Sequence, residues 1–194
     1  MPQTEQIHQH SVLRDIIRSR RSIRKFKQEP VPSAVILDML ETAKYAPNHR
    51  VTEPWRFIYV SSETGKANLI NTFAAFSKKS KPDMTEEKLQ NFKNTLGRVP
   101  GFLLVVFQED ENDRARDDDF AATSSLIQNL QLLAWEKGIG MVWKSGKILY
   151  DKEVHQAFGL QDNERFAAII QTGYPDEAPE VKKRTPIRDR FTEM

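Results

Sequence analysis

Residues 101–107 read Gly101-Phe102-Leu103-Leu104-Val105-Val106-Phe107, a glycine followed by six apolar side chains. A strand with one face in water alternates apolar and polar residues, whereas an unbroken apolar run of this length is typical of a strand covered on both faces. We therefore predict a strand over residues 102–107 that lies in the centre of a sheet.

The segments around this run carry both strand and helix signals. Short runs of β-branched and aromatic residues predict further strands over residues 57–60, 141–144 and 166–174. Apolar residues at helical spacing predict helices around residues 12–17, 33–46, 66–96 with a break at 81–83, 120–135 and 153–158. This mixture, with helix as the larger share, predicts an α+β or mixed α/β layer structure, and the tail is expected to be irregular.

The size and composition of the chain limit the classes of protein to which it can belong. Its 194 residues predict a single domain over 1–194, and its net charge of +2 is too small for a general nucleic-acid-binding surface. The absence of cysteine excludes disulfides and thiolate metal sites. Residues 1–10 are polar and lack the apolar core of an export signal, and no run of about 18 apolar residues occurs, so we expect a cytoplasmic protein that does not enter a membrane.

Signatures of hydrolytic and metal chemistry are missing from the sequence. The histidines show no ligand spacing apart from His8-x-His10, and no nucleophile elbow, Walker loop or Gly-x-Gly-x-x-Gly turn occurs. The acidic run Asp117-Asp118-Asp119 has two interpretations, a metal or acid/base site and favourable charge in front of the long helix, and we favour the second. We expect no metal site and no catalytic side chain.

The segment Arg20-Arg21-Ser22-Ile23-Arg24-Lys25-Phe26 places four cations and a hydroxyl just after an amphipathic helix. Arginine can direct two donors onto phosphate oxygens, and a serine hydroxyl adds a compact third donor. Taken alone, the segment has a second interpretation, a solvated basic helix end that is favoured by the helix dipole.

Two other segments are rich in aromatic, cationic or turn residues, one over 46–57 and one over 138–146. The first offers polar loop groups that can hydrogen-bond a heterocycle, and the second offers a strand framed by glycines where the backbone can approach a ligand. Together with the basic segment they fit a flat, phosphorylated cofactor. Taken on composition alone, Trp55 and Trp143 are more typical of core aromatics than of cofactor contacts.

In this order and spacing, the motifs resemble those of the nitroreductase family of FMN-dependent oxidoreductases, over essentially the whole chain. The similar features are the Arg-Arg-Ser-x-Arg-x-Phe motif after the first helix, the Ala46-Pro47 turn before Pro54-Trp55-Arg56-Phe57, and the long helix followed by a Gly-rich turn and strand. Val51-Thr52-Glu53-Pro54-Trp55 lacks both amides of the Asn-x-Gln-Pro-Trp motif of many members. The chain instead resembles the small-enzyme branch, in which Asn48, His49 and Arg50 take the place of that asparagine.

The resemblance implies a nitroreductase-like fold, with a central, mainly antiparallel sheet flanked by helices, in an intertwined homodimer. It implies that Arg20, Arg21 and Ser22 bind the phosphate and ribityl chain of FMN. Arg24 would lie near the flavin pyrimidine, where a cation favours hydride uptake. The remaining implied FMN-binding residues are Trp143, Lys144, Ser145 and Arg184, together with Asn48 and His49, which would serve the FMN of the other subunit.

The activity implied by the resemblance is ping-pong, two-electron hydride transfer. NADH or NADPH would reduce FMN, and a small electron-poor acceptor such as a nitroaromatic or a quinone would then be reduced.

Two alternatives from other classes remain: a phosphate-binding or nucleic-acid-binding module that uses residues 20–25, and a flavin-binding sensor or storage protein. The first predicts strongly salt-dependent nucleic-acid binding, and the second predicts flavin binding without consumption of a nicotinamide.

Overall fold

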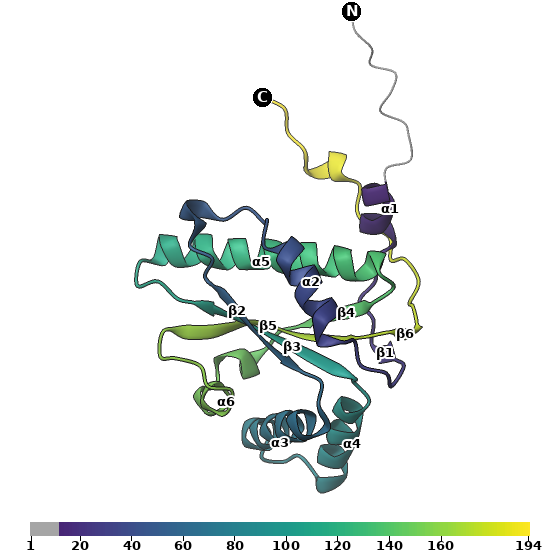
Figure 1. Ribbon diagram of the computed structural model, residues 1–194, viewed down its shortest axis with the longest axis vertical. Helices are drawn as coiled ribbons and strands as arrows, with labels where there is room; N and C mark the ends of the chain where they lie inside the picture. The colour runs from purple at the N-terminus through teal and green to yellow at the C-terminus, as the bar shows by residue number, and fades with distance from the viewer. Residues whose placement is uncertain (1–11) are drawn as a thin grey trace, which may run out of the picture.

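The computed structural model describes residues 12–194, and its central feature is a sheet with helices on both faces (Figure 1). Residues 1–11, which include His8-x-His10 and the segment compared with export signals, lie outside the described range. The elements in chain order are α1 (Val12–Ser19), β1 (Lys25–Phe26), α2 (Ser33–Ala43), the 3-10 turn η1 (His49–Val51), β2 (Trp55–Val60), α3 (Glu63–Ser80), α4 (Glu86–Gly97), β3 (Gly101–Gln108), α5 (Asp113–Glu136), β4 (Gly140–Lys144), η2 (Lys147–Tyr150), α6 (Lys152–Ala157), β5 (Glu164–Gly173), β6 (Pro175–Glu177) and η3 (Ile187–Arg190).

The larger sheet has the strand order β2-β3-β5-β4, and all its neighbouring strands are antiparallel. β3 lies inside this sheet, so that Leu104 is opposite Ile58 on one side and Ile169 on the other. All six side chains from Phe102 to Phe107 are fully buried. The predicted central strand and the α+β class are confirmed.

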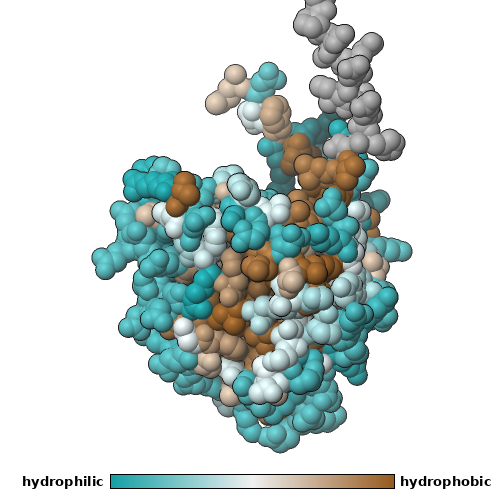
Figure 2. All heavy atoms as spheres, viewed as in Figure 1, coloured by the Kyte–Doolittle hydropathy of each residue, from teal (hydrophilic) through white to brown (hydrophobic). Residues whose placement is uncertain are grey.

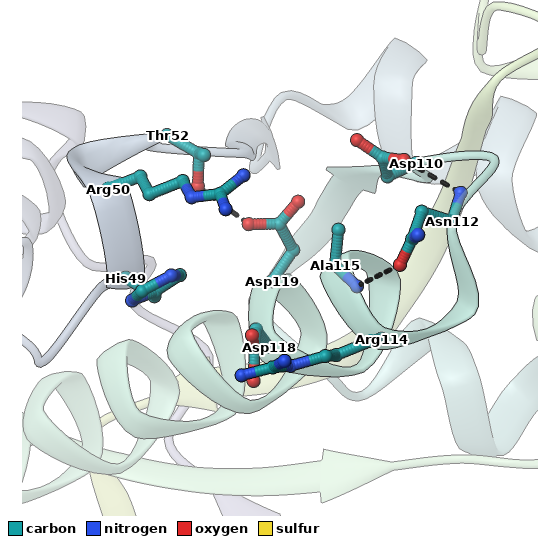
Figure 3. A pocket seen from close by; sticks show the side chains of 9 residues that line it. All are labelled: His49, Arg50, Thr52, Asp110, Asn112, Arg114, Ala115, Asp118 and Asp119. Atoms are coloured by element: carbon teal, nitrogen blue, oxygen red, sulfur yellow. Dashed lines mark hydrogen bonds between the residues drawn. The ribbon is translucent and has the colours of Figure 1, made fainter.

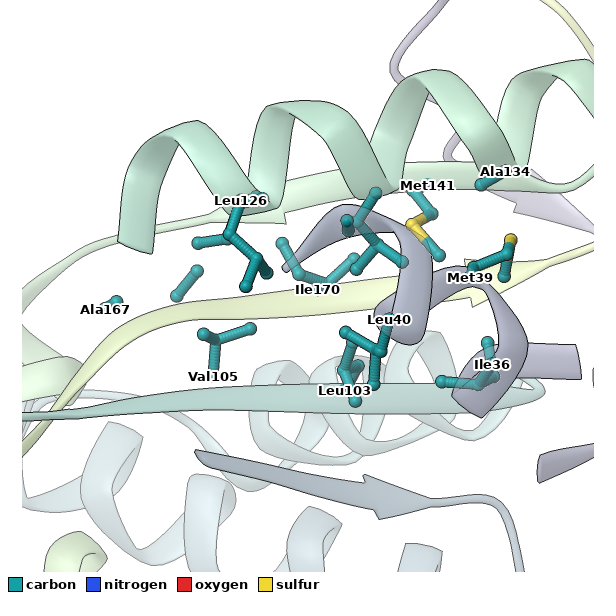
Figure 4. Packing of buried hydrophobic residues seen from close by; sticks show 14 of the residues in the cluster. Ile36, Met39, Leu40, Leu103, Val105, Leu126, Ala134, Met141, Ala167 and Ile170 are labelled. Atoms are coloured by element: carbon teal, nitrogen blue, oxygen red, sulfur yellow. The ribbon is translucent and has the colours of Figure 1, made fainter. Parts of the chain in front are cut away.

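The two faces of β3 explain why its sequence is apolar throughout. Successive side chains of a strand point to opposite faces, and here Leu103 and Val105 face the layer of α2 and α5. Figure 4 shows these two residues below Leu126 of α5. Phe102 and Leu104 belong to a second buried cluster with residues of α3, α4 and α6. Both faces exclude water, which is the main source of stability for such a sheet.

The long helix α5 starts earlier than the sequence predicted. It begins at Asp113, where the side chain of Asn112 caps it by accepting a hydrogen bond from the Ala115 amide at 3.1 Å. The acidic run over 117–119 therefore lies inside the helix, and the interpretation that placed it in front of the N-terminus was wrong. The first turn of α5 faces largely toward solvent, so the apolar periodicity that marks a helix starts only later.

The sequence also missed a second, two-stranded sheet in which β1 pairs antiparallel with β6. These strands have only two and three residues, too few to produce a periodic pattern. An ion pair between Lys25 and Glu177 adds to this pairing. This two-stranded ribbon of β1 and β6 holds the start of the C-terminal tail beside the basic segment over 20–26.

No helix in the described part of the chain combines the length and the apolar character that crossing a membrane requires.

Candidate functional site

The basic segment over 20–26 is held against the edge strand β4. Ser22 forms a parallel bridge with Met141, and the Ile23 amide donates a hydrogen bond to the Met141 carbonyl at 3.2 Å. The Ile23 side chain is fully buried beside Gly140, where an added Cβ would lie 2.6 Å from the Ile23 Cγ1 atom. A glycine at position 140 therefore allows the segment to approach the sheet.

Arg20 lies in a cluster of cations. Its Nη1 atom donates a hydrogen bond to Oε1 of Gln131 on α5 at 3.2 Å. Partial burial lowers the pKa of Arg20, and the positive charges of Arg21 and Arg184 lower this pKa further. Arg184, 164 residues later in the sequence, therefore lies in the electrostatic range of Arg20, which requires the tail to return to the end of α1.

A second pair of cations lies where the basic segment runs beside β4. Lys144 is the last residue of β4, and partial burial together with the charge of Arg24 lowers its pKa. Trp143 is half-buried against the core of the α2 and α5 layer, and Ser145 is exposed just after the strand. Trp143 is thus at least partly a core residue, as the alternative interpretation of its sequence allowed.

Among the described residues, these five cations have no acidic partner. Within residues 12–194, no ion pair involves Arg20, Arg21, Arg24, Lys144 or Arg184, although ten ion pairs occur between other described residues. Clustered like charges repel one another, so the cluster raises the free energy of the protein until an anion neutralises it. The donor set fits a phosphate group.

A cavity of about 920 Å³ lies between the end of α1, the basic segment and the tail. This volume is near the upper end of the range of small-molecule sites. The predicted residues that line it are Arg20, Arg21, Ser22, Arg24 and Arg184. Trp143, Lys144 and Ser145 are not among its lining residues, and Arg24 connects them to it electrostatically.

Asn48 and His49 lie elsewhere in the same chain. His49 lines a second, smaller cavity of about 360 Å³, formed with Thr52 and the first turns of α5 (Figure 3). Along α5, Gln131 contacts Arg20 and Asp119 contacts Thr52, and these twelve residues correspond to roughly 18 Å of helix. One chain therefore does not bring Asn48 and His49 to the cation cluster.

Two features of the site were not found in the sequence. Gln131 is 6% exposed and binds Arg20, and the signal that could have identified it is a polar residue on the apolar face of α5, four positions after Ile127. The pairing of Thr52 with Asp119 spans 67 residues and had no local signal. Among the described residues, no group of three or more acidic or histidine side chains is arranged to hold a metal ion.

Comparisons with known proteins address the family and the fold of this chain. The model of the Nitroreductase family matches residues 17–174. A solved nitroreductase-like family protein from Bacillus cereus is 33% identical, superposes with a TM-score of 0.85, and the alignment covers 97% of this chain and 98% of that one. A putative NAD(P)H nitroreductase of Haemophilus influenzae is 28% identical, with 87% of this chain and 91% of the relative covered.

A third similarity is to a solved iodotyrosine deiodinase bound to FMN and 3-iodo-L-tyrosine. It is 22% identical, with a TM-score of 0.74 over 94% of this chain and all of the other, so this likeness concerns the fold.

Proposed function

This chain belongs to the nitroreductase family, and from that premise we propose that it is an FMN-dependent NAD(P)H oxidoreductase that reduces small electron-poor acceptors. The observation that carries the proposal is the group of five cations that have no acidic partner in the part of the chain that the structure describes, beside a cavity of about 920 Å³. The relative from Haemophilus influenzae is described as a putative NAD(P)H nitroreductase, and the deiodinase structure contains FMN, which supports the same donor and cofactor here. A cytoplasmic location belongs to this proposal.

The residues of the cluster divide into two roles. Arg20, Arg21 and Arg184 would hold the phosphate, with the Ser22 hydroxyl as a further donor. Arg24 and Lys144 would lie at the ring system, together with Trp143 and Ser145. The chemistry that bound FMN would supply is the uptake of a hydride from NADH or NADPH and its transfer to nitroaromatics, quinones or similar acceptors.

The protein's own part in the chemistry is electrostatic and positional. Arg24 and Lys144 place positive charge where negative charge develops as electrons arrive, so they favour electron uptake. No side chain is assigned the transfer of a proton, since water can supply it, and we name no catalytic residue.

We place this activity in a homodimer that completes each site. α1 has no buried residue although Val12, Leu13 and Ile17 give it an apolar face, and each of these side chains is more than half exposed. Figure 2 shows apolar side chains gathered at α1. A second copy that covers this face would remove it from water, and it would let Asn48 and His49 reach the flavin that the other chain holds.

The absorption spectrum of the purified protein is the direct test, followed by anaerobic addition of NADPH. We expect flavin bands, either as purified or after reconstitution with FMN, that bleach with the nicotinamide and return when a quinone or nitroaromatic is added. A colourless protein that cannot take up FMN would contradict the proposal, and salt-dependent binding of DNA or RNA would then favour the nucleic-acid-binding alternative. FMN bands that do not bleach with NADH or NADPH would favour a sensor or storage protein.

A further inference from the structure

The segment over 48–53 has an unusual backbone. Arg50, Val51 and Glu53 have positive φ angles of 61°, 51° and 44°. This region is unfavourable for residues with a side chain, most of all for a β-branched residue such as Val51. Such a conformation persists only where surrounding contacts hold it.

Asn48 supplies the contacts within the segment. Its Oδ1 atom accepts a hydrogen bond from the Glu53 amide at 2.8 Å, and its Nδ2 atom donates one to Oγ1 of Thr52 at 3.0 Å. The amide of Asn48 therefore closes the segment on itself. His49 and Arg50 lie between Asn48 and Thr52, and their side chains are exposed.

A single hydrogen bond connects the segment to the rest of the described chain. Thr52 Oγ1 donates to Oδ1 of Asp119 at 2.6 Å, as the dashed line in Figure 3 shows, and within residues 12–194 no other hydrogen bond leaves residues 48–53. A hydroxyl has one proton, so Thr52 donates to the carboxylate while it accepts from Asn48. The three side chains form one directed chain of hydrogen bonds.

Asp119 is a rigidly held end point for this series of hydrogen bonds. It is 9% exposed, and it lies on α5, where Leu126 and Ile127 are fully buried in the core. A buried carboxylate is costly without a donor, and a hydrogen bond to an ionised acceptor is stronger than a neutral one. The position of the segment is therefore tied to a helix that packs into the core of the fold.

We infer that Asp119 is a positioning residue that acts through Thr52 and Asn48 to hold His49 and Arg50 in the orientation in which they reach the flavin of a second copy of this chain. This inference rests on the proposed function, because it takes the flavin and the dimer from there. The inference assigns a role in flavin binding to Asp119. Along α5 this carboxylate is about 18 Å from Gln131, which contacts Arg20 of the cation cluster in the same chain.

The test compares Thr52→Val, which removes the hydroxyl and keeps the shape, with Thr52→Ser, which restores the hydroxyl. Thr52→Val is expected to weaken FMN binding by about tenfold or more in a fluorescence titration, because it loses the hydrogen bond to the charged Asp119 and also the one that Thr52 accepts from Asn48. It should also speed amide hydrogen exchange in residues 49–53, measured by mass spectrometry on the protein without added flavin. Thr52→Ser should restore both values to within about twofold of the original chain.

Asp119→Asn gives an independent variant, and Asp117→Asn is its matched control. Both remove one charge from the same part of α5, but the Asp117 side chain is exposed and only Asp119 holds Thr52. We expect weaker FMN binding and faster exchange at 49–53 in Asp119→Asn alone. Equal effects of the two variants would show a general charge effect and would overturn the positioning role.

The outcomes separate this inference from the proposed function. If the unmodified chain binds no FMN, the proposed function is wrong and the flavin role of Asp119 is wrong with it. If the unmodified chain binds FMN and Thr52→Val binds it equally well, only the positioning role is overturned. Weaker binding without faster exchange at 49–53 would overturn it as well, because the effect would then not pass through the segment.

Discussion

At the scale of single residues, Arg20 combines a conspicuous motif with contacts that the sequence did not reveal. The motif indicated a phosphate-binding cation, and the structure adds the hydrogen bond to Gln131 and the nearby charges of Arg21 and Arg184. An arginine held between like charges gains more from an anion than an isolated surface arginine does, because the bound anion relieves repulsion as well as forming hydrogen bonds.

Replacing Arg20 tests this role. We expect Arg20→Ala to weaken FMN binding by about 1.5–3 kcal/mol, or roughly 10-fold to 150-fold, because a charge-assisted contact is lost. Fluorescence titration measures the affinity. Arg98→Ala is the matched control, since Arg98 is an exposed arginine next to α4 and does not line the cavity. Equal affinity of Arg20→Ala and the original chain would show that Arg20 is surface charge only.

Arg24 is expected to tune the cofactor rather than to hold it. Arg24→Gln removes one of the two charges at the end of β4, so we expect the two-electron potential of bound FMN to fall by about 20–40 mV, where 30 mV corresponds to about 1.4 kcal/mol. Anaerobic titration against a redox dye measures the potential. Lys25→Gln is the control, because Glu177 already neutralises Lys25. A potential that does not change in Arg24→Gln would contradict the assignment.

At the scale of elements, long periodic segments were predictable and short or polar ones were not. The central strand β3, and the break between α3 and α4, followed from apolar runs and from proline. The first turns of α5 and the β1–β6 ribbon did not, because an exposed helix turn and a strand of two residues carry no apolar period. The ribbon depends on residues about 150 positions apart.

The contact of the basic segment with β4 gives a prediction at this scale. Gly140→Ala places a Cβ 2.6 Å from Cγ1 and 2.7 Å from Cβ of the buried Ile23, which cannot move aside easily. We expect a loss of about 1–3 kcal/mol in the free energy of unfolding, measured by urea titration, together with weaker FMN binding. Gly97→Ala is the control, since outside its chain neighbours and the nearby backbone of its own helix no described atom lies within 4 Å of the added Cβ. Equal stability of both variants would contradict the tight approach at Gly140.

At the scale of the whole molecule, the two cavities lie apart within one chain. The cation cluster and the segment over 48–53 lie at different places along α5, so one chain does not combine them in a single pocket. The single-domain interpretation over 1–194 and the roles of the individual site residues stay predictions. A homodimer would bring the two cavities of different chains together.

The assembly can be tested on α1. Leu13 is 57% exposed in the single chain, so Leu13→Glu should leave the fold intact and destabilise an apolar contact with a second copy. We expect the sedimentation coefficient to fall from that of a dimer toward that of a monomer, and FMN binding to be lost. Lys88→Glu, which also introduces a negative charge but on the exposed side of α4, should remain dimeric. A chain that sediments as a monomer before any substitution would contradict the proposed assembly.

The sequence by itself determined the central strand, the α+β class and the basic motif, because these depend on local composition and on periods of two or about four residues. It also carried the family resemblance, through motifs that each lie within a short segment. Only the tertiary structure decided which distant residues come near one another: Arg184 lines the same cavity as Arg20, Arg24 lies within the electrostatic range of Lys144, and Thr52 hydrogen-bonds Asp119. The physical reason is that such meetings depend on how helices and strands pack around the common core, and no local pattern in the chain records that packing.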